Sequence, residues 1–373
     1  MLSDQSRISS HRFSPSRVSS DPHPLTQPLP RERRSASLRI GLVFILTLFA
    51  VVSCSSKPRE LVLYTSVDEP YARPIVDQFT HDTGIPVKLV TDTEATKSVG
   101  LAERLRAEKQ RPRCDVFWGN EIFNTVLLAD EGLLAPYDSP SAKDIRPLFR
   151  DKQNRWTAVG VRARVIATLG DTPEGPLGAS KQMSATNFPY LADLTLPRLK
   201  GKIAMARPAA GTTGGHVAAL YALWGDAKAD AFFKKLHDNG IVLLGGNSDV
   251  ANAVAAGNIE VGLTDNDDAA NTLINGQGIH ATLPDQEADN IGTLAVPTTV
   301  SLVQRDDLDP RAKQLVDYLL SAAVEQELID AKFAGWSVRS PETSFHAMNI
   351  DYAEVAKIVP RAIPRATAIL EGR

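Results

Sequence analysis

Leu61-Val62-Leu63-Tyr64, followed by the polar run Thr65-Ser66-Val67-Asp68-Glu69, is the stretch that first indicates the fold. Four apolar residues match the length of a short buried strand, and a helical pattern follows directly. Between Pro70 and Gly84, apolar side chains recur at helical spacing: Tyr71, Ile75, Val76 and Phe79. Pro at the start and Gly at the end are typical of helix boundaries. A strand, a loop and an amphipathic helix form the unit from which α/β proteins are built.

The same unit recurs along the chain. Further strands are predicted at 86–91, 115–118, 202–206, 241–244, 259–264 and 293–303. Helices are predicted around Leu101 and Leu105, over 211–224 and over 250–256. This alternation predicts an α/β fold with a mainly parallel sheet. No repeat of fixed period is visible, and no apolar run after residue 53 is long enough to span a bilayer.

Polar residues gather in the loops that follow these strands. In open α/β sheets ligands bind beyond the carboxyl ends of the strands, so the loops could converge on one site. Each loop taken alone could equally be an ordinary turn or helix cap. Six such loops together favour a ligand site, and its candidate residues are Thr65, Ser66, Asp68, Glu69, Glu94, Asn120, Glu121, Gly211, Thr212, Thr213, Asn247 and Asp265, with the acidic pair Asp267 and Asp268.

The N-terminal region has a different composition. Residues 1–37 are rich in Ser, Pro and Arg without apolar periodicity, which indicates disordered or processed sequence. Basic residues up to Arg39 then precede the apolar run 40–52, in the order of a secretory signal. The run is shorter than the roughly 20 residues that cross a bilayer. A single transmembrane anchor and a twin-arginine signal are the weaker alternatives.

Val51-Val52-Ser53-Cys54 resembles a lipobox, the site at which bacterial lipoproteins receive lipid on a cysteine. The resemblance predicts a signal peptide over 1–53, lipidation of Cys54, a tether over 54–59 and a lipid-anchored protein of the cell envelope or periplasm. The alternative is a plain signal peptide with an incidental cysteine. With Cys54 lipidated, Cys114 has no disulfide partner and is predicted to be a buried thiol.

Charge and motifs argue against two other classes of protein. The formal net charge of −3 becomes −7 once residues 1–53 are removed, which excludes a basic nucleic-acid-binding surface. The chain has no Gly-x-Ser-x-Gly, His-Glu-x-x-His or Cys-x-x-Cys motif. We therefore predict a protein that is not an enzyme, although a secreted metal-dependent hydrolase and a sensor protein stay as alternatives.

Four stretches resemble the periplasmic ferric-ion-binding proteins of the extracellular solute-binding family: 61–66, 115–121, 131–137 and 201–204. The resemblance implies a type 2 periplasmic-binding-protein fold, with two α/β lobes, hinge strands and a central cleft. Lobe I would comprise 60–158 and 298–345, and lobe II 159–297 and 346–373. The resemblance also implies a monomer without a permanent cofactor, which delivers its ligand to an ABC permease and its ATPase.

The metal ligands of the family fall on different residues here. The family histidine corresponds to Asp68, the glutamate to Asn120, and the tyrosine pair to Asp267 and Asp268. Carboxylates are hard donors, so Asp68, Glu69, Asp267 and Asp268 are the predicted ligands of Fe³⁺ or of another hard cation such as Ca²⁺ or Mn²⁺.

The anion that accompanies iron in this family binds at a helix N-terminus. Gly211-Thr212-Thr213 stands at the matching place, and Asn247 matches a polar contact. Free N–H groups at a helix start favour an anion. A cation with a bound anion fits these residues, and so does an anionic or zwitterionic organic solute such as a phosphonate.

Overall fold

The computed structural model describes six stretches of the chain: 59–92, 100–170, 188–209, 211–276, 278–340 and 344–373. The chain divides into Met1–Ser55 and a compact unit Ser56–Arg373, and all described residues belong to the second. The predicted signal peptide, Cys54 and Glu94 lie outside the described residues.

The first group of elements follows the predicted alternation. Its parallel strands stand in the order β2-β1-β3, with β1 (Leu61–Thr65), β2 (Val87–Thr91) and β3 (Val116–Gly119). Its first three helices are α1 (Glu69–Thr83), α2 (Gly100–Ala107) and α3 (Ile122–Asp130). The strands predicted at 61–64, 86–91 and 115–118 are confirmed.

Apolar side chains at alternate positions explain this group. Leu61 and Leu63 of β1 are fully buried in one core cluster with Ile75 and Phe79 of α1. Gly84 ends α1 in the left-handed conformation (φ 69°), which a residue without a side chain adopts at little cost.

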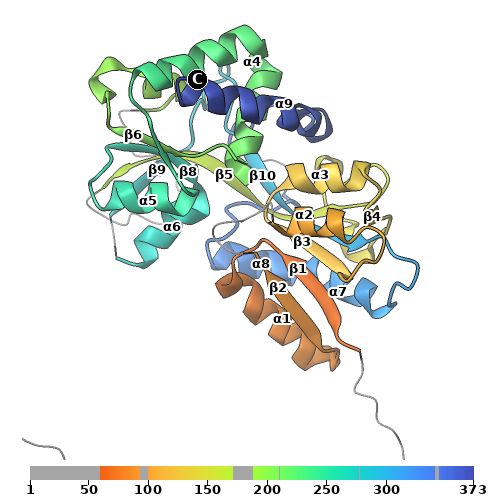
Figure 1. Cartoon of the computed structure of the whole chain (residues 1–373). Coiled ribbons are helices and arrows are strands. Elements are labelled where there is room, and N and C mark those ends of the chain that lie inside the picture. The colour runs from red at the N-terminus through yellow and green to blue at the C-terminus, as the bar shows by residue number, and fades with distance from the viewer. Residues whose placement is uncertain (1–58, 93–99, 171–187, 210, 277, 341–343) are drawn as a thin grey trace, which may run out of the picture. The chain divides into compact units, whose positions relative to one another are not determined.

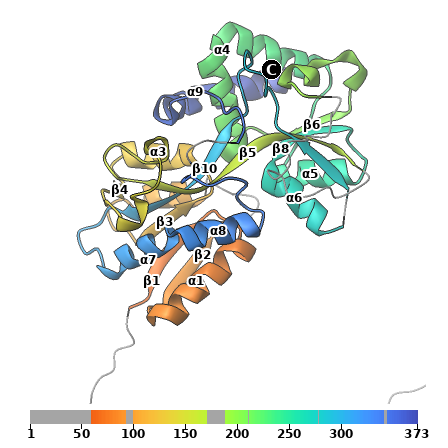
Figure 2. The same cartoon turned by 180° about the vertical axis from the view of Figure 1, so that it is seen from behind.

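Later segments complete the first group. The short strand β4 (Leu134–Ala135) pairs with β10 (Ala295–Val303). The helix α7 (Arg311–Leu319) packs against β3 and β10, and α8 (Ala322–Asp330) packs against the long strand β5 (Thr157–Leu169), as Figure 2 shows.

β5 and β10 run antiparallel and connect the two groups of elements (Figure 1). The first half of β5 pairs with β10, and its second half, from Arg164 on, pairs with β8 (Val261–Asp265). Both strands are irregular at one place, where Gly160 has a positive φ and the register shifts between Pro297 and Thr299. The predicted lobe boundaries at 158/159 and 297/298 fall inside these strands, and the assignment of segments to lobes stays a prediction.

Within the described residues, the second group contains the four strands β6 to β9. β6 (Ile203–Ala206) pairs in parallel with β7 (Val242–Leu244) and β8, and β9 (Ile279–Thr282) pairs antiparallel with β5. Its helices are α4 (Gly211–Asp238), α5 (Asn247–Ala255) and α6 (Asn266–Ile274). The predicted end of the first helix at Trp224 coincides with a kink at Gly225, where φ is 74°.

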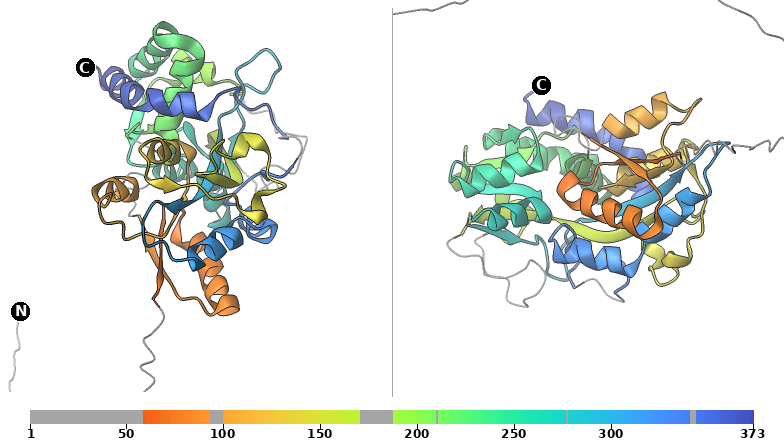
Figure 3. Two further views of the ribbon diagram at one scale, coloured as in Figure 1. Left: turned by 90° about the vertical axis from the view of Figure 1, so that its right-hand side faces the viewer. Right: turned by 90° about the horizontal axis from the view of Figure 1, so that it is seen from below.

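The C-terminal helix α9 (Tyr352–Leu370) packs along α4 and also contacts α3, and Figure 3 shows this dark blue helix beside the green α4. It therefore touches both groups of elements. Cys114 is free and fully buried, which confirms the predicted thiol. None of the helices in the described stretches has the length and apolar content needed to cross a membrane.

Asp285, after β9, is a buried carboxyl whose proton affinity depends on the fold. Its backbone is left-handed (φ 57°), and its side chain is only 7% exposed. Burial, and then the neighbouring Asp193, raises the pKa of Asp285 from 3.8 to about 6. The folded protein therefore binds this proton more tightly than the unfolded chain does. The resulting stabilisation is fully present below pH 3.8 and is lost as the pH rises through 6.

We expect Asp285→Asn to raise the free energy of unfolding at pH 7.5 by about 1–2 kcal/mol, because the buried carboxylate is replaced by a neutral amide. The difference should shrink as the pH falls and vanish only near pH 3, where the carboxyl is protonated in both the folded and the unfolded state. Urea unfolding at both pH values measures this difference in unfolding free energy. The control is Asp289→Asn, which removes an exposed carboxylate and should unfold as wild type does at both pH values. A destabilised Asp285→Asn at pH 7.5 would contradict the prediction.

Candidate ligand-binding site

Five charged side chains form a buried cluster where β5 passes from β10 to β8. They are Arg162, Arg164, Asp265, Asp267 and Asp268, and none is more than 7% exposed. Arg162 and Arg164 lie two residues apart on β5, so their side chains point to the same face of the sheet. Asp265 is the last residue of β8, and Asp267 and Asp268 lie in the first turn of α6.

The interpretation of residues 265–268 as a loop was wrong. Asp265 directly faces Arg164 across the β5–β8 pairing, and helix α6 begins at Asn266. The Asn266 side chain accepts a hydrogen bond from the backbone N–H of Ala163 at 2.6 Å. This contact ties the start of α6 to β5, so Asp267 and Asp268 have fixed positions beside the arginines.

Asp265 accepts hydrogen bonds from four side chains. Its Oδ1 accepts from the Arg164 guanidinium at 2.6 Å. Its Oδ2 accepts from Thr212 Oγ1 at 2.6 Å, from Asn247 Nδ2 at 3.1 Å and from the Arg162 guanidinium at 3.4 Å. Two helix starts, those of α4 and α5, are thus joined to the end of β8 through one carboxylate.

Arg162 connects the cluster to the first group of elements. Its Nη1 donates to Asp267 Oδ2 at 2.9 Å, and its Nη2 donates to the backbone carbonyl of Asn120 at 2.6 Å. The guanidinium also lies over the Phe333 ring, 5.3 Å from the centroid. Asp268 accepts from Ser248 Oγ at 2.6 Å, which links α6 to α5.

The close pairing of opposite charges stabilises the charged forms of Arg162 and Asp265. Burial alone would lower the pKa of Arg162, but Asp267 and Asp265 outweigh it and raise that pKa. Burial alone would raise the pKa of Asp265, but the guanidiniums of Arg164 and Arg162 hold it below its usual value. His216, one turn into α4, has a pKa lowered to about 3, first by burial and then by Arg164, so it is neutral.

Tyr71 brings a phenol from the first group to the same place. The Tyr71 hydroxyl donates to Asn271 Oδ1 of α6 at 2.6 Å, and its ring packs against Phe333. Burial, and then the negative charge of Asp267, raises the pKa of Tyr71 to about 12. The contact joins α1 to α6, so it links the two groups of elements beside the cluster.

The three carboxylates are close enough together to bind one cation. Asp265, Asp267 and Asp268 each offer an oxygen, and these oxygens lie within 4.8 Å of one another. The two guanidiniums beside them are suited to an anion, because their planar donor pattern matches carboxylates and phosphates. The cluster can therefore bind opposite charges at adjacent positions.

The structure gathers some of the predicted ligand residues and not others. Thr212, Thr213 and Asn247 lie with Asp265, and Thr213 Oγ1 donates to Asn247 Oδ1 at 3.1 Å. Gly211 is the first residue of α4, so these residues form a helix start as predicted. Asn120 contacts the cluster through its backbone carbonyl, which accepts a hydrogen bond from Arg162.

The other predicted residues that the structure describes have contacts outside the charged cluster or stand at a helix cap. Thr65 donates to the Trp118 carbonyl, Ser66 bonds with Asn120, and Glu121 caps α3 by accepting from the N–H groups of Phe123 and Asn124. Glu69 is exposed and pairs with Arg73 at 2.6 Å, away from the carboxylate group. Asp68 stands half-buried at the N-cap of α1.

The glycines of the α4 start provide packing space. A methyl group on Gly214 would lie 2.7 Å from Ile363 of α9, and one on Gly215 only 2.0 Å from the Phe123 ring of α3. Gly214 and Gly215 therefore let α4 approach both helices closely. The anion site at this helix start stays a prediction.

Sequence reasoning missed Arg162, Arg164 and Tyr71. A signal for the arginines exists, because Val161-Arg162-Ala163-Arg164-Val165 places two charges on one face of an apolar run. Charges in such a strand need buried counter-charges, and the acidic stretch 265–268 supplies them. Tyr71 fits the apolar spacing of α1, so nothing in the sequence separates its hydroxyl from a core residue.

The sequence is similar to a known protein family and to several ferric-binding proteins. Residues 61–333 match the family described as bacterial extracellular solute-binding proteins. The "Fe(3+)-binding periplasmic protein" of Serratia marcescens is 29% identical over 209 residues, which are 56% of this chain and 57% of that protein. The "Major ferric iron-binding protein" of Neisseria meningitidis serogroup A is 26% identical over 233 residues, 61% of this chain and 65% of that protein. The matches thus span somewhat more than half of these relatives.

Solved structures share the fold at lower identity. The ferric binding protein from Campylobacter jejuni has a TM-score of 0.71 and 23% identity, and the alignment covers 83% of this chain and 99% of that one. Iron-bound HitA from Pseudomonas aeruginosa has a TM-score of 0.70 and 20% identity, with 84% and 99% covered. These likenesses confirm the predicted two-lobe α/β fold class.

Proposed function

The chain belongs to the bacterial extracellular solute-binding proteins, and from this premise we propose that it captures ferric iron together with an anion for an ABC importer. The observation that carries the proposal is the group formed by Asp265, Asp267 and Asp268, whose carboxylate oxygens lie within 4.8 Å of one another. Carboxylate oxygens are the hard donors that Fe³⁺ prefers. The ferric-binding relatives support the same ligand.

The arginines explain why the cation would need a companion anion. Arg162 and Arg164 already neutralise much of the carboxylate charge, and they would repel a bare cation. An anion that binds to Arg162 and to the N–H groups at the start of α4 would release Asp267 for the metal. Cation and anion would then bind cooperatively. The anion neutralises the arginines that repel the cation, and the cation neutralises the carboxylates that repel the anion.

Tyr71 favours a strongly polarising cation over a weak one. Its pKa of about 12 means that the phenol stays protonated in the empty protein. A bound cation lowers the pKa of the groups that ligate it, and a trivalent cation does so most. We propose that, when iron binds, the Tyr71 phenol loses its proton, gives up its hydrogen bond to Asn271 and ligates the metal.

A second candidate ligand is an anionic or zwitterionic organic solute such as a phosphonate. Arg162 and Arg164 favour it, since two buried guanidiniums on one strand are a common way to bind phosphonate or carboxylate groups. An amine on the same solute would take the place of the cation beside Asp267 and Asp268. With such a solute Tyr71 would keep its hydrogen bond to Asn271, because no metal would be there for the phenol to ligate.

The partners and location follow from the family. Its members bind solutes and are not enzymes, and the relative from Serratia marcescens is named as a periplasmic protein. We propose that the mature chain acts as a monomer, is held at the membrane by lipid on Cys54, and delivers its ligand to a permease driven by an ATPase. Closure of the two lobes around the ligand would report occupancy to the permease.

Metal analysis and a thermal-shift screen test the proposed ligand. Protein purified without chelator should contain iron, and Fe³⁺ supplied with phosphate or carbonate should raise the melting temperature by about 5–10 °C at a hundredfold excess over Kd. Mn²⁺, Ca²⁺ and the anions alone should give smaller shifts. A larger shift with a phosphonate than with iron would reject the ferric ligand in favour of the second candidate.

A further inference from the structure

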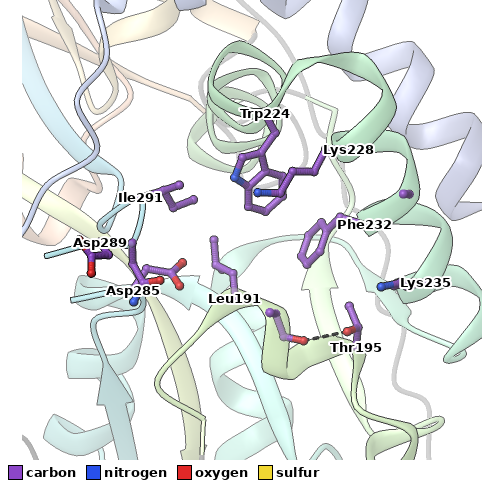
Figure 4. A pocket seen from close by; sticks show the side chains of 12 residues that line it. Leu191, Thr195, Trp224, Lys228, Phe232, Lys235, Asp285, Asp289 and Ile291 are labelled. Atoms are coloured by element: carbon purple, nitrogen blue, oxygen red, sulfur yellow. Dashed lines mark hydrogen bonds between the residues drawn. The ribbon is translucent and has the colours of Figure 1, made fainter. Parts of the chain in front are cut away.

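A cavity of about 350 Å³ lies in the second group of elements, apart from the charged cluster. Its walls come from a short helical turn (Leu191–Thr195), from the second half of α4 and from the segment 285–291 (Figure 4). The volume lies within the range of small-ligand pockets, about 300–1000 Å³. The cavity shares no lining residue with the cluster.

The centre of the cavity is aromatic. The rings of Trp224 and Phe232 meet edge to face with centroids 5.3 Å apart, and Leu191 and Ile291 add apolar surface. The indole N–H of Trp224 is shielded from solvent and has no hydrogen-bond partner among the described residues. An apolar or aromatic ligand group would pack well against these rings.

Charged side chains of both signs line the cavity. Figure 4 shows Asp285 and Asp289 on one side of the rings, Lys235 on the other side, and Lys228 across the Trp224 ring. Among the described residues no salt bridge within 4.0 Å joins these lysines to these acids. The Lys228 ammonium lies over the Trp224 ring at 5.0 Å, and its charge acts on Asp285 from a distance and slightly offsets the rise in the pKa of that carboxyl. The lining therefore presents separate charges of both signs to whatever occupies the cavity.

Asp285 is the strongest indication that something binds. Its side chain is more than nine-tenths buried, and its Oδ2 has no hydrogen-bond partner among the described residues. A buried carboxylate oxygen without a donor costs free energy. A small turn about the Cβ–Cγ bond would present this oxygen to a donor in the cavity.

We propose that this cavity is a second small-molecule site, which binds a zwitterion of amino-acid size with an aromatic side chain. Its ammonium group would donate to Asp285 beside Asp289, its carboxylate would lie towards Lys228, and its ring would pack on Trp224 and Phe232. The site is independent of the ligand of the charged cluster, so it stands whether that ligand is iron or an organic solute.

Titration calorimetry and saturation-transfer NMR with L-phenylalanine test the site. We expect a Kd of about 1 mM or below, which is what twelve non-hydrogen atoms support at ordinary ligand efficiency. Phenethylamine lacks the carboxylate and 3-phenylpropionate lacks the ammonium, so each should bind at least about tenfold more weakly. No saturation up to 10 times that expected Kd would overturn the proposal.

Two variants locate the binding. Asp285→Asn should weaken L-phenylalanine binding at least about tenfold, and it is expected to be more stable than wild type at pH 7.5, so unfolding does not explain a loss. Lys234→Gln should bind as wild type does, because Lys234 lies on α4 but pairs with Asp238 outside the cavity. Unchanged binding by Asp285→Asn, or binding that is lost in Asp267→Asn instead, would refute the second site.

Discussion

Asp265→Asn is expected to lower the free energy of unfolding by about 3–5 kcal/mol, because it leaves two buried guanidiniums short of their counter-charge. Asp265 accepts from Arg164, Arg162, Thr212 and Asn247, and its side chain is 2% exposed. An amide at this position carries no charge, and its NH₂ group would face donors. Urea unfolding at pH 7.5 measures the loss.

Asp226→Asn is the matched control, because Asp226 also pairs with two arginines but on the surface. Its contacts with Arg361 and Arg365 are 2.7 and 2.9 Å long, and the side chain is 41% exposed. Exposed ion pairs contribute about 0–1 kcal/mol, so this variant should unfold almost as wild type does. A loss of less than about 1 kcal/mol for Asp265→Asn would show that the cluster does not stabilise the fold.

The pH dependence gives an independent check on the same residue. The folded-state pKa of Asp265 is held below its unfolded value of 3.8, so the folded protein stabilises the charged form. That stabilisation is present above pH 3.8 and is lost as the pH falls through the lower folded pKa. The difference between wild type and Asp265→Asn should therefore be constant from pH 5 to 8 and shrink only in stronger acid.

Much of the fold was predictable because short-range patterns determine its elements. The run 61–64 is apolar and becomes β1, and the stretch 259–264, with apolar residues at every second position, contains most of β8. Gly84 and Gly225 interrupt the helical patterns before them, and both have a positive φ in the structure. Each of these signals lies within a few residues of the element that it predicts.

The site was less predictable because its contacts join distant segments. The polar residues after β1 and β3 look like ligands, yet Ser66 bonds with Asn120 on the neighbouring strand end and Glu121 caps α3. Arg164 meets Asp265 from 101 positions away, and Tyr71 meets Asn271 from 200 positions away. Residue type alone cannot distinguish a loop carboxylate that binds a ligand from one that caps a helix.

Asp267→Asn and Asp268→Asn should each weaken ferric binding by about a hundredfold or more, or about 2.7 kcal/mol. Each change removes one hard anionic donor from a group of three carboxylates whose oxygens lie within 4.8 Å. The side chains keep their shape, so the lobes should still assemble. Competition for Fe³⁺ against citrate, with phosphate present, measures the change in affinity. Asp249→Asn removes an exposed charge on α5 and serves as the control.

Arg162→Met distinguishes the two candidate ligands, ferric iron and an organic anion, because its expected effect differs between them. Without this guanidinium, Asp267 and Asp265 lose a positive neighbour, so iron should bind without a companion anion and its affinity should no longer depend on phosphate. A phosphonate, in contrast, would lose its principal partner and bind at least about a hundredfold more weakly. Circular dichroism establishes first that the variant is folded. If both Asp→Asn variants bind iron as wild type does while Arg162→Met loses phosphonate binding, the importer carries an organic anion and the ferric proposal is wrong.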